Sequence, residues 1–318
     1  MNTVVVSIRK RLENWAGLFA RGFCMGAADV VPGVSGGTMA FILGIYTRFI
    51  DAIKSFDWQW IRAIARCDWH GALSRPHFGF VLPLGCGILG AVMFFTRVVP
   101  LPQLLLTHPE QVYGLFFGLV FGSIVVLMVD FGRLSVRDLP ALAGGLCLGL
   151  IVVTAVPAET PETWWFVLLS GAFAICAMVV PGISGSFVLL LLGKYAYVLD
   201  AVGHLRLGVI VPFVAGMVLG LATFTRLLSW VLHHHERLSL LAINGILIAS
   251  LWVIWPFQMR HYVEVRGKSR LLETKPMLPE LSTTTLEAAA LALTGLVLVI
   301  VLHRLGRAAA RRSSRPPR

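Results

Sequence analysis

The sequence predicts an all-α integral membrane protein with an inverted-topology repeat, and two observations lead to this expectation. Hydrophobic residues make up 57% of the 318 residues and charged residues 14%, with a mean hydropathy of +0.80, whereas a soluble domain carries about 25% charged residues. The motif PGxSG occurs at Pro32–Gly36 and again at Pro181–Gly185, each time between apolar flanks. We therefore expect a single membrane domain over 1–318, each half a broken or re-entrant helical hairpin plus about three transmembrane helices.

The repeat extends well past the motif. Residues 22–53 align on residues 171–202 without a gap, and beyond the hairpins the triplet Phe-Thr-Arg occurs at equivalent places in both halves. We place repeat 1 at about 16–137, repeat 2 at about 164–302 and a basic cytoplasmic tail at 303–318. The matching residues are Gly22/Gly171, Ala28/Ala177, Pro32/Pro181, Gly33/Gly182, Ser35/Ser184, Gly36/Gly185, Gly44/Gly193, Tyr46/Tyr195, Asp51/Asp200, Pro83/Pro212, Gly87/Gly216 and Arg97/Arg226.

Residues 16–47 form the first broken segment. As one continuous helix they would span about 48 Å at about 1.5 Å per residue, which exceeds one crossing of a hydrocarbon core of roughly 30 Å. Pro, Gly and Ser in succession interrupt a helix. The loop that follows, 48–77, holds five basic residues and three tryptophans, which is typical of a cytoplasmic segment at the membrane interface. Both ends of the broken segment are then on one side, which favours a re-entrant hairpin.

Six further apolar segments are predicted to cross the membrane. Three of them separate the first hairpin from the second broken segment, 164–199. An odd number of crossings turns the second half upside down relative to the first, which is the inverted-repeat architecture of many alternating-access transporters. The segments are Phe78–Arg97, about 112–129 and 139–156, followed by 208–228, 239–257 and 285–302.

The distribution of positive charge gives the orientation. The N-terminal residues 1–15 and the arginine-rich tail are expected in the cytoplasm, and the loop 157–163, which has no Lys or Arg, is expected outside. Residues 260–275 then fall outside despite five basic residues, against the positive-inside bias. The net charge of +11 therefore reflects topology and contact with anionic lipid rather than binding to nucleic acid.

The two PGxSG tips are the candidate binding site. A helix that restarts after such a tip exposes unpaired amides at the positive end of its dipole, and both features suit an anion. The first tip adds the hydroxyls of Ser35 and Thr38, and the second adds those of Ser184 and Ser186. In a membrane these amides need protein, water or ligand as partners. The alternative is that the tips are packing kinks whose small residues let helices approach closely.

Arg97 and Arg226 are candidate phosphate ligands because each is expected to end an apolar span at an equivalent position of the repeat. A guanidinium can hold a phosphate with two parallel hydrogen bonds. The alternative is an ordinary arginine at the end of a span, whose charged group extends to the lipid headgroups.

Asp29 is a carboxylate in an apolar run, where the second repeat has Met178. A charge at membrane depth is expensive and is a functional hypothesis by default. We expect either proton coupling, or pairing with Arg21 or Arg97, or a structural role in which Asp29 caps the restarted helix. The repeated pairs Tyr46/Tyr195 and Asp51/Asp200 are expected to mark hairpin ends at the membrane interface, where Tyr is favoured.

Two other functions fit parts of the pattern. Residues Gly33–Gly37 also satisfy GxSxG, which would make Ser35 the nucleophile of an intramembrane serine hydrolase, but a nucleophile needs a positioned base and here the serine is duplicated. A small-anion channel with two re-entrant loops would share the symmetry of the tips. The five cysteines show no metal-binding spacing, so we expect no metal or other cofactor.

The two signatures, GAADVVPGVSGGTMAFILGIY and VVPGISGSFVLLLLGKY, resemble those of a bacterial family of polyprenyl-phosphate transporters, formerly a domain of unknown function. The likeness covers about 16–302. It implies a multi-pass protein of the cytoplasmic (inner) membrane, not an enzyme, that returns undecaprenyl phosphate, the lipid carrier of cell-wall synthesis, from the outer to the inner leaflet. Protons or another ion are candidate coupling partners, and the oligomeric state is left open. The site residues that the resemblance implies are Asp29, Gly33, Ser35, Gly36, Gly37, Thr38, Gly182, Ser184, Gly185 and Ser186; Arg97 and Arg226 rest on the repeat.

Overall fold

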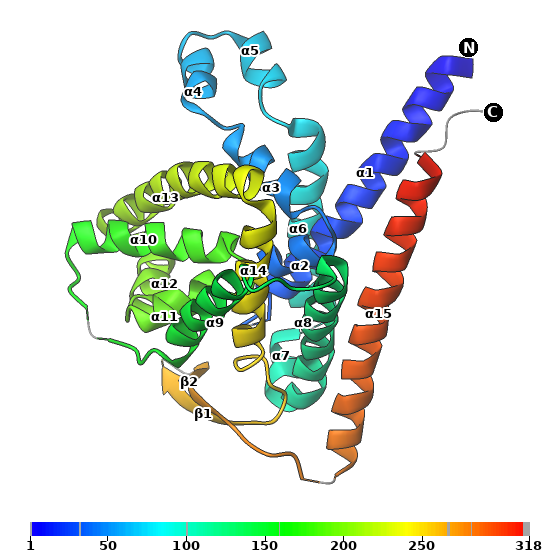
Figure 1. Ribbon diagram of the computed structural model, residues 1–318. Helices are drawn as coiled ribbons and strands as arrows, with labels where there is room; N and C mark the ends of the chain where they lie inside the picture. The colour runs from blue at the N-terminus through cyan, green and yellow to red at the C-terminus, as the bar shows by residue number, and fades with distance from the viewer. Residues whose placement is uncertain are drawn as a thin grey trace.

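The computed structural model describes residues 2–31, 33–99, 101–158, 160–265, 268–280 and 282–313. In these ranges the chain forms fifteen helices and one two-stranded hairpin (Figure 1). The membrane domain is helical, as the composition predicts.

The first repeat and the second begin with the same three elements. In both, a helix stops at the PGxSG tip, a seven-residue helix restarts after it, and a third helix follows at an angle; that angle is 108° between the two short helices of the second half. Gly33 and Gly182 have φ of 83° and 90°, a left-handed conformation that glycine adopts at little cost. The elements are α1 (Asn2–Asp29), α2 (Gly36–Ile42) and α3 (Tyr46–Lys54), then α10 (Trp164–Val179), α11 (Gly185–Leu191) and α12 (Tyr195–Gly203).

The long apolar helices lie close to the predicted spans. In the described part of the chain, four helices are long and apolar enough to cross a membrane, or five if the bent pair α11 and α12 counts as one broken span. They are α6 (Phe78–Arg97), α8 (Pro109–Phe131), α13 (Leu207–His234) and residues 283–304 of α15 (Thr283–Ser313). The shorter helices α9 (Leu139–Thr154) and α14 (Glu236–Ser250) complete the two halves.

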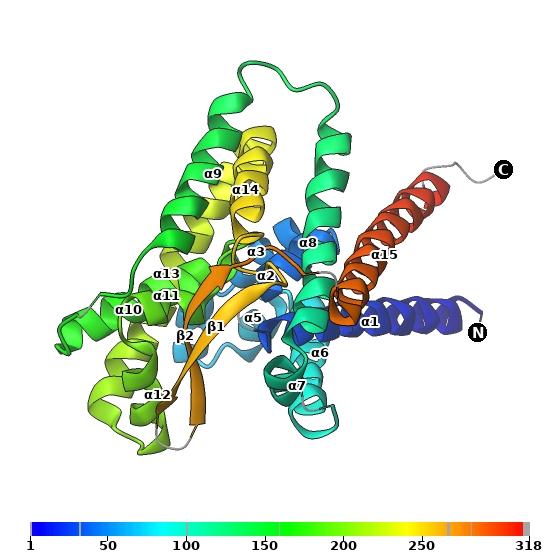
Figure 2. The same ribbon diagram turned by 90° about the horizontal axis from the view of Figure 1, so that it is seen from below.

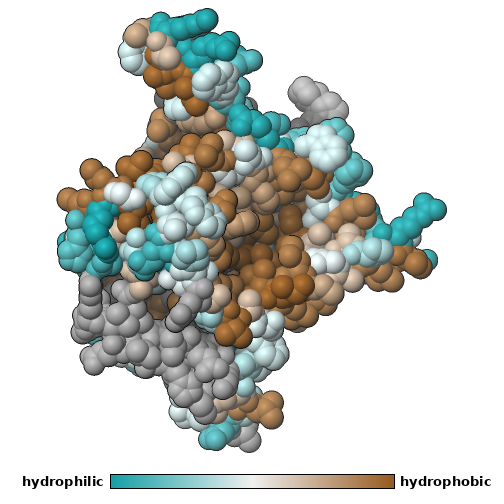
Figure 3. Space-filling model, turned by 90° about the vertical axis from the view of Figure 1, so that its left-hand side faces the viewer, coloured by the Kyte–Doolittle hydropathy of each residue, from teal (hydrophilic) through white to brown (hydrophobic). Residues whose placement is uncertain are grey.

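Small secondary-structure elements lie at the two ends of the molecule. The helices α4 (Trp58–Ala65) and α5 (Trp69–Ser74) project at the top of Figure 1, at the same end as the start of α1 and the end of α15. Figure 3 shows hydrophilic and apolar residues mixed over that projection, where Trp58 and Trp69 are exposed, and a broad hydrophobic surface below it. A band of apolar surface between polar ends is the surface expected of a protein that crosses a bilayer.

The expectation of an all-helical chain is wrong at 258–276. There β1 (Gln258–Val265) pairs antiparallel with β2 (Lys268–Pro276), with an irregularity in register between His261 and Tyr262. The sequence Tyr-Val-Glu-Val-Arg has the β-branched and alternating residues of a strand. The charge of the segment alone does not indicate this strand. The hairpin lies at the end of the molecule opposite α4 and α5 (Figure 1).

The hairpins pack on their neighbouring helices through equivalent glycines. A Cβ on Gly22 would collide with the carbonyl of Leu84, and a Cβ on its counterpart Gly171 would collide with the carbonyl of Phe213. These contacts join α1 to α6 in the first half and α10 to α13 in the second. Because only glycine permits such a close approach, the matched glycines fix the same helix pair in both halves.

The remaining long helices exchange partners between the halves. Helix α8 packs along α15, and α14 packs along α9 (Figure 2). The closest approaches again use glycine: Gly118 meets the carbonyl of Ala292, and Gly145 meets that of Ala242. The two halves therefore share one interior, in which α14 lies beside both tips, since Gly33 contacts Val253 just after α14 and Gly182 contacts Ile246 within it.

Candidate functional site

The first tip is closed by its own residues. The amide of Gly36 donates to Asp29 Oδ1 at 2.6 Å, and the amide of Gly37 donates to Ser35 Oγ at 3.1 Å. Of the roles left open for Asp29, the geometry shows the cap of α2. Neither expected partner is present: in the described part of the chain no ion pair joins Asp29 to Arg21 or Arg97, and both arginines are exposed.

The two tips also bond to each other across the molecule. Thr38 Oγ1 accepts a hydrogen bond from the amide of Gly182 at 2.8 Å. Ser35 Oγ donates to the carbonyl of Met178 at 3.2 Å, and Tyr46 donates to the carbonyl of Val179 at 3.1 Å. Thr38 and Ser35 are each 2% exposed, so these bonds form in the interior. The structure thus brings the two predicted motifs together through residues 144 apart in sequence.

Tyr46 corrects one expectation. It was placed at the membrane interface, yet only 4% of it is exposed and it bonds to the opposite tip. The sequence signal for this contact is that a tyrosine occurs at the same distance from the motif in both repeats.

The second tip is more open than the first. Ser184 Oγ and Ser186 Oγ lie 2.9 Å apart, and no side chain caps the start of α11. Ser186 is exposed and Ser184 half-buried, while Gly185 packs on the carbonyl of Ala174 in α10. Two hydroxyls beside the start of a helix are a suitable arrangement for an oxyanion. The repeated motif therefore gives two different local sites, one filled by protein groups and one accessible.

The two arginines are both exposed on their helices. Arg97 is the last residue of α6 and is exposed, as expected of the end of a span. Arg226 does not end a span, because α13 continues to His234, and its Nη1 donates to the carbonyl of Ala222 at 2.5 Å. The residues after Arg226, Leu-Leu-Ser-Trp-Val-Leu, stay mostly apolar and contain no helix breaker, which explains the longer helix. In the described residues no hydrogen bond links either arginine to a tip.

A polar contact between the halves was missed from the sequence. Lys54 of α3 donates to Ser229 Oγ of α13 at 3.1 Å, Ser229 donates to Asp51 Oδ1 at 2.9 Å, and His233 Nε2 lies 3.6 Å from Asp51 Oδ2. Beside it opens a cavity of about 1040 Å³ to which Arg48 and Asp51 contribute. The sequence predicts Asp51 only as a hairpin end at the membrane interface, and nothing in it indicates that Asp51 meets α13.

Two buried polar side chains were also missed. Lys194 is 2% exposed, donates to the carbonyl of Thr160 at 2.6 Å and lies 5.6 Å from the ring centre of Phe166. Asn244 of α14 is fully buried, and in the described structure neither its Oδ1 nor its Nδ2 has a hydrogen-bond partner. A buried unpaired amide is costly and is rare in folded proteins. For Lys194 the sequence does contain a signal, which is a lysine inside an otherwise apolar hairpin.

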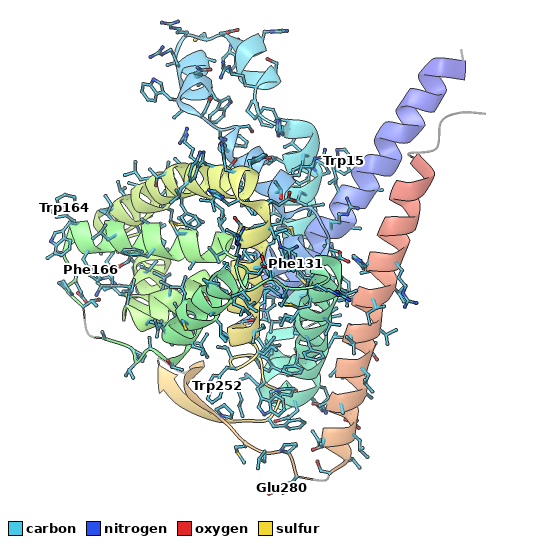
Figure 4. The ribbon with its side chains drawn as sticks, in the orientation of Figure 1. Trp15, Phe131, Trp164, Phe166, Trp252 and Glu280 are labelled. Atoms are coloured by element: carbon cyan, nitrogen blue, oxygen red, sulfur yellow. The ribbon has the colours of Figure 1, made fainter. Side chains whose placement is uncertain are left out.

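The chemistry of a serine hydrolase is not assembled at the first tip. The partners of Ser35 are a backbone carbonyl and a backbone amide. Among the described residues no group of three His, Cys, Asp or Glu side chains is arranged to hold a metal. Aromatic side chains instead mark the surface, where Trp15 and Trp164 project from α1 and α10 (Figure 4).

The long apolar helices and the paired tips define a class, a multi-pass helical membrane protein with two interrupted helices. The names of its family and relatives are those of transporters and not of enzymes. The chain belongs to the undecaprenyl phosphate translocase-like family, whose model matches residues 25–271. A polyprenyl-phosphate transporter of Vibrio cholerae serotype O1 is 36% identical over 245 residues, covering 77% of this chain and 79% of the relative. A polyprenyl-phosphate transporter of Staphylococcus aureus is 29% identical over 255 residues, covering 74% and 84%. No solved structure matches the chain.

Proposed function

We propose that this protein carries polyprenyl phosphate across the cytoplasmic membrane from the outer to the inner leaflet. The relatives supply the substrate class by their names. The direction is the one that returns a spent lipid carrier to the cytoplasmic enzymes of cell-wall synthesis. The tail of such a lipid stays in hydrocarbon, and only the phosphate needs a polar path through the protein.

The observation that carries the proposal is the meeting of the two tips in the interior. The Thr38–Gly182 hydrogen bond joins them, while Ser184 and Ser186 remain accessible. A bare phosphate in hydrocarbon would cost many kcal/mol. Amides and hydroxyls at a broken helix lower that cost without a metal. In this conformation the Gly36 amide is hydrogen-bonded to Asp29, so the second tip is the phosphate site.

The inverted repeat supplies the proposed mechanism. The matched glycine contacts of α1 with α6 and of α10 with α13 make each half a packed unit, and the partner exchange of α8 and α14 keeps the units together. Movement of one unit against the other breaks the Thr38–Gly182 bond. The first tip becomes free when Asp29, which lies in the same half, also releases the Gly36 amide. The phosphate then passes from the second tip to the first, with Arg97 and Arg226 guiding it at the surface.

Asp29 is the proposed coupling group in this cycle. When the first tip releases the Gly36 amide, the carboxylate loses its hydrogen-bond donor and is expected to take up a proton. Asp29→Asn keeps the shape and removes the titration, so transport by this variant is expected to lose its pH dependence. Transport that varies with pH in the variant as in the parent protein would reduce Asp29 to a helix cap.

The inverted topology has its own test. Glu162 lies in the loop expected outside, and the native Cys67 lies in the segment expected inside; both are exposed. In intact cells an impermeant thiol reagent should label a Glu162→Cys variant that lacks the native cysteines and should spare a variant whose single cysteine is Cys67. Labelling of both from the outside contradicts the inverted arrangement.

The transport test uses purified protein in liposomes loaded with undecaprenyl phosphate. A phosphatase added outside removes phosphate only from the outer leaflet, so its progress measures movement between leaflets. The double variant Ser184→Ala/Ser186→Ala should slow this movement. The matched control is Thr223→Ala, which removes an exposed hydroxyl that bonds only to its own helix at the carbonyl of Leu219. Equal rates for parent, double variant and control would remove the second tip from the mechanism.

A further inference from the structure

An elongated apolar groove runs beside the first tip. Its volume is about 610 Å³, within the range of about 300–1,000 Å³ typical of ligand pockets. It lies between α1, α2, α7 (Leu101–Thr107), α8 and α15, the helices on the right of Figure 1. Along α15 its lining runs from Glu287 to Leu302, about 22 Å at 1.5 Å per residue. That is most of a hydrocarbon core of roughly 30 Å.

The lining is apolar along its length and polar at one end. The polar side chains are His108, Gln111 and Glu287, at the starts of α8 and α15. Gln111 Nε2 donates to Glu287 at 2.9 Å, and Gln111 Oε1 is buried without a partner in the described structure. The remaining lining residues are aliphatic or aromatic side chains and the thiol of Cys24. This shape suits a single long hydrocarbon chain rather than a compact solute.

One wall of the groove belongs to the first hairpin itself. Met39, Ile42 and Leu43 follow Thr38 directly in and after α2, and Cys24 and Ala27 stand within two turns of Asp29 on α1. A chain in the groove therefore touches the same two helices whose ends form the first tip. Displacement of the hairpin would move the groove wall and the tip together.

The opposite wall is a feature that the second half lacks. Helix α7 is inserted between α6 and α8 and contributes Leu101 and Leu104 to the groove. In the second half α13 and α14 meet at His235, which ends one helix and starts the next. Because α7 has no counterpart in the second half, this wall of the groove is not needed for the packing that the two halves share.

We propose that this groove binds the isoprenoid tail of polyprenyl phosphate and holds the lipid beside the first tip while its phosphate moves. The proposal rests on the proposed function and adds the site for the tail. The long apolar lining matches a lipid with a single hydrocarbon chain. Ordinary bilayer phospholipid, the other occupant with suitable chains, is an outcome of the test.

The native cysteines make the groove testable. Cys24 lines it, whereas Cys176 is equally half-buried but lies on α10 against the carbonyl of Gly220. In two variants that each keep one of these thiols and carry alanine at the other four cysteines, an apolar maleimide is added to liposomes. Undecaprenyl phosphate at ten times its Kd should leave about one tenth of the sites free and slow labelling of Cys24 about tenfold. Labelling of Cys176 should not change.

Two competitors identify what is recognised. Phosphatidylglycerol and inorganic phosphate at the same concentration should leave the labelling of Cys24 unchanged. Protection by phosphatidylglycerol equal to that by undecaprenyl phosphate would show a groove filled by bilayer lipid and would overturn the proposal. Protection by inorganic phosphate would assign the effect to the headgroup and would overturn it as well.

A filling variant separates this inference from the proposed function. Ala27→Trp narrows the groove and should slow leaflet-resolved transport, whereas Leu293→Trp, on α15 outside the groove and 61% exposed, should not. The parent protein could transport the lipid while Ala27→Trp keeps full activity and Cys24 is not protected. That result would refute tail binding in the groove and would leave the proposed function intact. Protection of Cys24 without transport by the parent refutes the function and leaves a binding groove.

Discussion

The bond between the tips predicts a sharp effect for Thr38→Val. Valine keeps the volume of threonine and removes the oxygen that accepts from the Gly182 amide at 2.8 Å. Since Thr38 is 2% exposed and water has little access, that amide loses its partner, at a cost of about 1–3 kcal/mol. The separated arrangement of the tips should therefore gain roughly 5–150-fold in population relative to the joined one.

The measurement is hydrogen exchange of the Gly182 amide in detergent or nanodiscs, followed by mass spectrometry of the peptide that contains it. Its protection should fall by about 5–150-fold in Thr38→Val. The control is Thr225→Val on α13. Thr225 is 1% exposed, but its hydroxyl donates to the carbonyl of Leu221 in its own helix at 2.5 Å. In Thr225→Val this carbonyl still accepts its backbone hydrogen bond within the helix. Equal protection in both variants, or no change at Thr38→Val, would refute the account of the joined tips.

Three further predictions concern packing, pH and a buried charge. Gly22→Ala should destabilise the protein by about 1–3 kcal/mol through the clash with α6. Gly17→Ala, with open space around it in α1, should not lower the melting temperature, because Ala favours a helix more than Gly does. The Arg237 guanidinium, bonded to Asp138 at 2.7 Å, and the amide of Ser135 lower the pKa of Asp138 to about 2. The free energy of unfolding should therefore fall as pH drops from the ordinary pKa of an aspartate towards about 2, and Asp138→Asn should lack this fall. Lys194→Met should speed proteolysis of the loop 157–163, which the lysine tethers; an unchanged cleavage rate would contradict the tether.

The elements of the fold were largely predictable from the sequence. The apolar segments gave the helices, with Phe78–Arg97 matching α6 at both ends, because long apolar helices are specified by local composition. The breaks after Asp29 and Val179 follow from Pro and Gly in succession, which act on the backbone of their own residues. Errors arose where the sequence pattern was weak or overlooked, as at the β-hairpin and at the end of α13.

The candidate site was predictable in its residues and not in its contacts. The repeated motif identified Ser35, Thr38, Ser184 and Ser186, but symmetry in sequence suggested two equal anion sites. The structure has one tip closed by Asp29 and one tip open. That difference depends on a carboxylate whose counterpart in the second repeat is Met178, and on which amide it reaches once the chain has folded.

By itself, the sequence determined that this protein is a helical membrane protein of two related halves with interrupted helices, because hydropathy, charge distribution and helix breakers are local properties. The tertiary structure decided which groups meet. The bond from Gly182 to Thr38, the contact of Lys54 with Ser229 and the groove beside α7 join segments far apart in the chain. Such contacts depend on how the helices pack. Glycines at the helix crossings determine this packing, because a side chain there would collide with the neighbouring helix.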